Sequence, residues 1–113
     1  MSTIASSELS RPERRRRQRA KITLGGRYML SDRREHDCWT IDISSSGVAV
    51  MGPVKGAIGE RIVAYFDRVG RVEGMIVRHF EKCFAIEMRA SALRRDKLDL
   101  QIDELVKSGM AAH

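Results

Sequence analysis

The sequence is poor in aromatic side chains, which make up 5% of it, although 42% of its residues are hydrophobic. A core built from these residues must be mostly aliphatic. No apolar run approaches the roughly 20 residues of a membrane-spanning helix, and the first ten residues lack the charged-then-apolar order of a signal peptide. We therefore expect a cytoplasmic protein without membrane insertion, and 113 residues suffice for one domain.

Cysteine and histidine are also scarce, with two and three copies. The cysteines match neither a C-x-x-C motif nor the pattern of a secreted disulfide framework, so we expect reduced thiols. The histidines show no zincin spacing and no pairing with a nucleophile, and the four metal-binding candidates fit no structural zinc pattern. These candidates are His36, Cys38, His79 and Cys83. We therefore expect no enzyme activity, no catalytic residue, no metal and no cofactor.

The charge of the chain is concentrated in one stretch, Arg11 to Lys21, which reads R-P-E-R-R-R-R-Q-R-A-K. This stretch holds seven of the 21 basic residues and one of the 15 acidic residues, so its net charge equals the +6 of the whole chain. The remaining residues carry 14 charges of each sign. Because clustered cations repel one another, the pattern predicts a neutral domain with a cationic arm and an anionic partner.

The segment from 20 to 89 consists of short alternating apolar runs separated by polar or glycine-rich turns. Six or so short antiparallel strands are typical of a small all-β barrel. The predicted strands lie within residues 20–30, with a bend at the Gly25-Gly26 pair, and within 36–44, 48–51, 61–66, 72–80 and 82–88.

The second of these strands alternates most clearly, and S-S-S-G at 44–47 predicts a turn after it. One face carries Trp39, Ile41 and Ile43. The other carries Cys38, Thr40, Asp42 and Ser44. We expect the first face to point into the core and the side chains of Asp42 and Ser44 to point together away from it.

Only the last segment has helical spacing, and Ser91 is a suitable N-cap for a helix at about 92–107. The residues predicted to face the core are Leu98, Ile102, Leu105 and Val106. Leu93 and Leu100 fall on the opposite side, where they form either a second contact surface, such as a dimer interface, or a pair of exposed leucines. The expected domain spans 14–107. Residues 1–13 are expected to hold a disordered leader and the start of the basic arm, and 108–113 a disordered tail.

Two short motifs combine with this pattern. Arg15 and Arg19 are spaced R-x-x-x-R just before the first strand, and D-I-S-S-S-G begins at Asp42. The chain thereby resembles the PilZ domain, a small β-barrel family that binds the bacterial second messenger cyclic di-GMP and pairs R-x-x-x-R with [D/N]-x-S-x-x-G. The stretches G-G-R-Y-M-L-S-D-R-R-E, V-G-R-V-E-G and R-R-D-K-L are also similar to stand-alone PilZ proteins, so the resemblance covers roughly Arg14 to Leu105.

The resemblance implies that the flexible arm folds over ligand held against the barrel. Arg15 and Arg19 would clamp the ligand, and the platform beneath it would consist of Asp42, Ser44 and Gly47. Arginine can pair bidentately with phosphate or with guanine O6 and N7, and a carboxylate accepts from guanine N–H groups. Cyclic di-GMP is therefore the expected partner, and an unidentified downstream protein would read the ordered arm.

Two assignments within the arm depend on the family. Arg14 occupies the position associated with ligand stoichiometry, and an arginine there resembles members that bind an intercalated dimer of cyclic di-GMP. Arg11 and Arg15 also satisfy R-x-x-x-R. We favour Arg15 and Arg19, because Arg19 adjoins the first strand whereas Arg11 lies beyond Pro12.

Two other functions compete with this interpretation. A basic arm could hold nucleic-acid phosphates without sequence preference, but the body of the chain offers neither a basic groove nor an exposed aromatic ladder. The second is a PilZ-like scaffold that binds a protein partner and no longer binds the nucleotide. The intact motifs argue against it. The D-x-S-x-x-G motif alone would also fit an ordinary turn.

Overall fold

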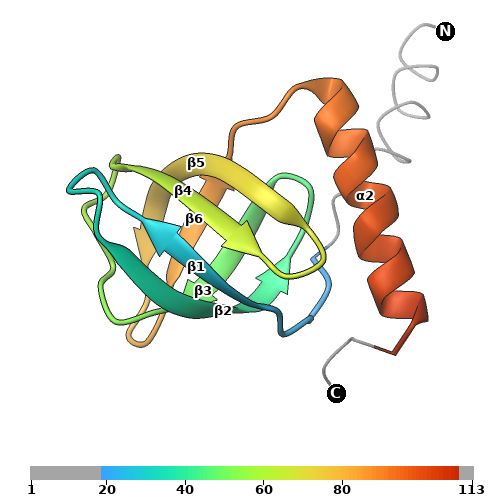
Figure 1. The fold of residues 1–113 in the computed structure, drawn as a ribbon, viewed down its shortest axis with the longest axis horizontal. Coiled ribbons are helices and arrows are strands. Elements are labelled where there is room, and N and C mark those ends of the chain that lie inside the picture. The colour runs from blue at the N-terminus through green and yellow to red at the C-terminus, as the bar shows by residue number, and fades with distance from the viewer. Residues whose placement is uncertain (1–18, 110–113) are drawn as a thin grey trace, which may run out of the picture.

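The computed structural model describes residues 19–109, so Arg14, Arg15, the predicted leader and the end of the predicted tail lie outside it. Six strands are followed by one helix: β1 (Gly25–Met29), β2 (Glu35–Ile43), β3 (Gly47–Met51), β4 (Arg61–Phe66), β5 (Gly70–His79), β6 (Phe84–Met88) and α2 (Ala92–Lys107). The predicted fold class, a small antiparallel barrel with a C-terminal helix, is confirmed (Figure 1).

The strands form a closed barrel in the order β1-β2-β3-β6-β5-β4, and every pairing is antiparallel. Closure pairs β4 with β1, so the sheet has no open edge. Alternate residues of the strands fill the interior, including Phe84, Ile86 and Met88 of β6. Consistent with the scarcity of aromatics, most of the buried core residues are aliphatic.

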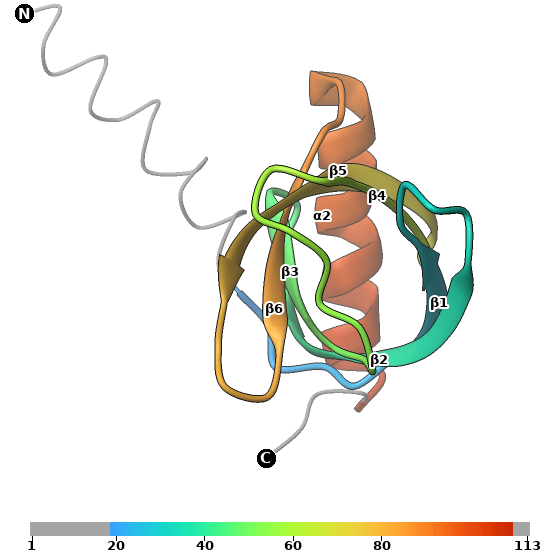
Figure 2. The same ribbon diagram turned by 90° about the vertical axis from the view of Figure 1, so that its left-hand side faces the viewer.

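Helix α2 lies across one opening of the barrel (Figure 2). Ser91 caps it as predicted, since the Ser91 hydroxyl accepts a hydrogen bond from the backbone N–H of Arg94 at 3.2 Å. Three of the four residues predicted to face the core are buried, namely Leu98, Ile102 and Leu105. Val106 is 42% exposed, which corrects that assignment, whereas Leu93 and Leu100 are exposed on the opposite side as expected.

Polar contacts also attach the helix to the barrel. The guanidinium of Arg94 donates to the carbonyl of Arg71 at 2.9 Å, and the amide of Gln101 donates to the carbonyl of Arg68 at 3.4 Å. The carbonyl of Arg68 lies in the connection between β4 and β5, and the carbonyl of Arg71 lies near the start of β5. Within residues 19–109, no helix has the length and apolar character that crossing a membrane requires.

The predicted faces of β2 are wrong over part of the strand. Trp39 and Ile41 are 49% and 37% exposed, whereas Cys38 and Thr40 are buried. The cause is a β-bulge, because the pairing with β3 shifts register between Thr40 and Asp42. A bulge adds one residue to a strand, so the inward–outward alternation reverses after it. Thr40 and Ile43 therefore both point inward, although they are three positions apart.

The chain before β1 is held against β2 and does not form the strand from Ala20 that the sequence predicts. Ala20 forms an isolated bridge with Ile43, with backbone hydrogen bonds of 2.8 and 3.0 Å. Thr40 makes a second attachment: its hydroxyl donates to the carbonyl of Ile22 at 2.5 Å and accepts from the N–H of Leu24 at 2.8 Å. These contacts place Arg19, the first described residue, beside the end of β2.

Candidate functional site

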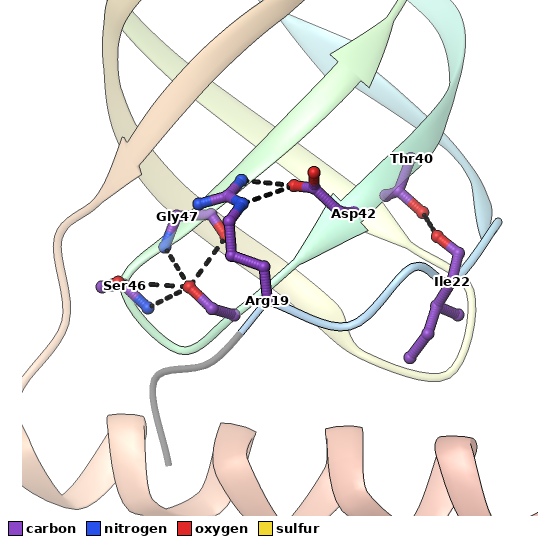
Figure 3. A network of polar contacts seen from close by, with 7 residues as sticks. Arg19, Ile22, Thr40, Asp42, Ser46 and Gly47 are labelled. Atoms are coloured by element: carbon purple, nitrogen blue, oxygen red, sulfur yellow. Dashed lines mark hydrogen bonds and ion pairs between the residues drawn. The ribbon is translucent and has the colours of Figure 1, made fainter. Parts of the chain in front are cut away.

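Arg19 and Asp42 form an ion pair on the outer surface of the barrel. The guanidinium Nε and Nη2 atoms both contact Oδ1 of Asp42, at 2.6 and 2.5 Å (Figure 3). The side chains are 44% and 24% exposed, so the pair is open to solvent. The structure thus joins one residue of the predicted clamp to one residue of the predicted platform, although 23 positions separate them.

Ser44 does not point outward with Asp42, in contrast to the prediction. It follows the last residue of β2, in the turn that leads to β3, and is completely buried there. Its hydroxyl oxygen accepts hydrogen bonds from the N–H groups of Ser46 and Gly47, both at 3.2 Å. It also lies 3.1 Å from the Ser46 hydroxyl. In this structure Ser44 shapes the turn between β2 and β3. Figure 3 shows its two backbone partners, Ser46 and Gly47.

Gly47 begins β3 beside this turn. A Cβ atom at this position would lie 2.9 Å from the carbonyl oxygen of Ile86 and 3.5 Å from Nη1 of Arg19. The first distance is too short for a real Cβ atom, so glycine is required for the close approach of β3 and β6. The second distance is an ordinary contact. The structure brings Gly47 to the ion pair, whereas the predicted residues Arg14 and Arg15 lie outside the described part.

A surface hollow of about 500 Å³ extends from the ion pair across the barrel. Its floor contains Ala49 of β3 and Ala85 of β6, which face each other in the pairing of the two strands. Ile41 and Val77 also line it, and each lies where a β-bulge shifts the register of its strand. The two bulges therefore turn branched apolar side chains outward at this surface.

Sequence reasoning missed the far end of this hollow, which contains Arg78, Phe80 and Cys83. These residues are more than 30 positions from Asp42 in the sequence, and the only available signal was the prediction of two successive strands at 72–80 and 82–88. The ammonium group of Lys55 donates to the carbonyls of Phe80 and Glu81, the latter at 2.8 Å. A connection from another part of the barrel therefore fixes the β5–β6 turn.

The two cysteines differ sharply in their surroundings. Cys83 is partly exposed in the hollow, whereas Cys38 is buried inside the barrel. Burial, followed by the charge of Asp37, raises the pKa of the Cys38 thiol to about 11. In residues 19–109, no group of three His, Cys, Asp or Glu side chains is arranged to hold a metal ion.

Alkylation with iodoacetamide should therefore select Cys83. Because the thiolate is the nucleophile, we expect Cys38 to resist modification from pH 7 to about pH 10 in the folded protein, while Cys83 is modified. Mass spectrometry of the digested protein would measure both sites, and denaturant should make both cysteines react. Modification of Cys38 as fast as Cys83 in the folded state would contradict the structure.

The comparisons with known proteins agree on one family. The family model of the PilZ domain matches residues 13–104. No curated protein matches the sequence significantly. The crystal structure of the PilZ domain of CeSA, from a cellulose-synthesizing bacterium, is similar with a TM-score of 0.59 and 18% identity, over 80% of this chain and 96% of that one.

A second similar structure is YcgR from Escherichia coli, which was crystallised in complex with cyclic di-GMP. The TM-score is 0.61 at 17% identity, and the match covers 85% of this chain but 47% of the YcgR chain. These likenesses concern the fold, while the family model covers most of the sequence. This chain belongs to the PilZ domain family.

Proposed function

We propose that this chain is a cytoplasmic, non-enzymatic receptor for cyclic di-GMP. The observation that carries the proposal is the Arg19–Asp42 pair at the edge of an open hollow on the barrel surface. Membership of the PilZ family and the cyclic di-GMP complex of YcgR support it. The ligand class fits the charges, because cyclic di-GMP combines anionic phosphodiesters with guanine edges that both donate and accept hydrogen bonds.

In this proposal Asp42 and the arginines divide the recognition of the ligand. Both contacts of Arg19 go to Oδ1 of Asp42, so Oδ2 can accept from the N–H donors of a guanine. Arg15 and Arg19 bind phosphate or guanine O6 and N7 through their planar guanidinium groups. Ser44 and Gly47 contribute through the shape of the turn, since Ser44 is buried.

We further propose that ligand binding folds the cationic stretch over the hollow and that a downstream protein recognises the resulting surface. In this proposal the segment becomes ordered when ligand binds, and charge-assisted contacts with the ligand stabilise the ordered state. Arg14 would contact a second ligand molecule, so that an intercalated dimer of cyclic di-GMP binds. The stoichiometry of binding tests this part separately.

Calorimetric titration with cyclic di-GMP tests the receptor function. We expect saturable binding to the wild type, with a stoichiometry of two ligands per chain. A bidentate arginine contact is worth ~1 to 3 kcal/mol, so Arg15→Ala and Arg19→Ala should each weaken binding roughly 5- to 150-fold. Arg27→Ala is the matched control, because Arg27 is an exposed arginine in β1 that does not line the hollow.

Two outcomes would decide against the proposal. Absence of saturable binding to the wild type would overturn it. Tight binding to arbitrary DNA, strongly dependent on salt and unaffected by Asp42→Ala, would show instead that the arm binds nucleic acid. A stoichiometry of one would reject the dimeric ligand while leaving the receptor function in place.

A further inference from the structure

We infer that a row of four residues across the barrel forms a cradle for one guanine base, in which Arg78 binds the acceptor edge of the base opposite Asp42. The row consists of Asp42, Ala49, Ala85 and Arg78. The inference rests on the proposed function and adds to it a residue, 36 positions after Asp42 in the sequence, that determines which base is accepted.

The pairing registers establish the row. Asp42 of β2 is the partner of Ala49 in β3, Ala49 is the partner of Ala85 in β6, and Ala85 is the partner of Arg78 in β5. All four line the same hollow. The carboxylate and the guanidinium therefore stand at opposite ends of one row, with only methyl groups between them.

The dimensions of the row suit a flat base. Neighbouring strands lie about 4.8 Å apart, so the backbones of Asp42 and Arg78 are separated by roughly 14 Å across the three steps. Both side chains line the hollow, one at each end of this row. The alanine side chains are small, so they leave room for a ring above the floor of the hollow, and Ile41 and Val77 add apolar surface beside it. A planar ring can lie on this floor while its edges meet the polar ends.

Arg78 is available for such a contact. It is exposed, and among residues 19–109 no carboxylate forms an ion pair with it. Its guanidinium carbon lies 6.0 Å from the centre of the Phe80 ring, a cation–π distance that restrains the side chain. The backbone beneath Phe80 is in turn held by Lys55. The guanidinium is thus positioned before ligand arrives.

The chemistry of the two ends selects guanine. Its O6 and N7 atoms are adjacent acceptors that fit the fork of an arginine, whereas adenine presents a donor, the N6 amino group, in place of O6. The Watson–Crick edge of guanine, which meets this acceptor edge at O6, presents N–H donors to Asp42. An adenine in the same position would direct a donor at Arg78, so the row should reject it.

A titration with a modified ligand tests the contact of Arg78 directly. The probe is cyclic di-GMP in which both bases are 7-deazaguanine, so that a C–H group replaces the N7 acceptor. We expect Arg78→Met to weaken binding of cyclic di-GMP roughly 5- to 150-fold. The wild type should bind the 7-deaza ligand more weakly than cyclic di-GMP, and this penalty should shrink or disappear in Arg78→Met.

The control is Arg61→Met, since Arg61 is an exposed arginine in β4 outside the hollow. It should keep both the affinity and the 7-deaza penalty of the wild type. Arg78→Lys keeps the charge without the fork, so it should also lose most of the penalty. Thermal unfolding would verify that each variant is folded, and bound ligand should protect Cys83 from alkylation in the wild type.

The outcomes separate this inference from the function on which it rests. If the wild type binds cyclic di-GMP but has no 7-deaza penalty, or if the full penalty persists in Arg78→Met, the role of Arg78 is refuted and the receptor function stands. If the wild type does not bind cyclic di-GMP at all, both proposals fall.

Discussion

Exchanging Asp42 for arginine should abolish high-affinity binding of cyclic di-GMP. The change removes the carboxylate that contacts Arg19 at 2.5 Å and places a second cation beside it. Loss of a carboxylate acceptor together with like-charge repulsion should cost about 3 kcal/mol or more, which corresponds to roughly 150-fold in affinity. Calorimetric titration of the variant with cyclic di-GMP would measure the loss.

Asp37→Arg is the matched control for this variant. Asp37 lies in the same strand and is exposed, and it does not line the hollow. The same charge reversal at that position should leave affinity within a few-fold of the wild type. Equal losses in both variants would mean that the overall charge of the barrel governs binding and that Asp42 has no special role.

Replacing Thr40 with valine should strongly destabilise the folded barrel. Valine keeps the shape of the buried side chain but removes the hydroxyl that joins β2 to the chain before β1. The carbonyl of Ile22 and the N–H of Leu24 would then lack their partner. Each unsatisfied buried group costs about 1 to 3 kcal/mol, so for the two groups we expect the free energy of unfolding to fall by roughly 2 to 6 kcal/mol.

Urea denaturation of the wild type, Thr40→Val and Thr40→Ser would measure this effect. Serine retains the hydroxyl, so Thr40→Ser should be much less destabilised. Because Thr40 attaches the segment that places Arg19 beside Asp42, Thr40→Val should also weaken ligand binding if it remains folded. A valine variant as stable as the serine variant would show that the two hydrogen bonds contribute little.

The β-barrel could be predicted because its strands are short, alternate with period two and are separated by turn residues. The cap at Ser91 depends only on neighbouring residues, and it was predicted correctly. Val106 was assigned wrongly because helical spacing places it at the margin of the buried face. The helical period predicts which side of the helix faces the barrel, whereas the packing against the barrel determines how wide the buried face is.

The candidate site was less accessible to prediction. Arg19 and Asp42 were expected at one site, and their side chains do meet. Ser44 was expected beside them on the surface, yet it is buried in the turn after β2, where its hydroxyl accepts from two backbone N–H groups. Trp39 and Ile41 were expected in the core, yet the bulge after Thr40 leaves them exposed. A bulge arises from the pairing of two strands, so the residues of one strand do not reveal it.

The sequence by itself determined the strand pattern, the closing helix, the cationic stretch and the two motifs, because each depends on residues that are close along the chain. Only the tertiary structure decided which side chains face the ligand hollow. The outward position of Ile41 and Val77 depends on two bulges, and the alignment of Asp42 with Arg78 depends on three strand registers. Those registers are set by barrel closure and by packing of the whole core, which no short stretch of sequence contains.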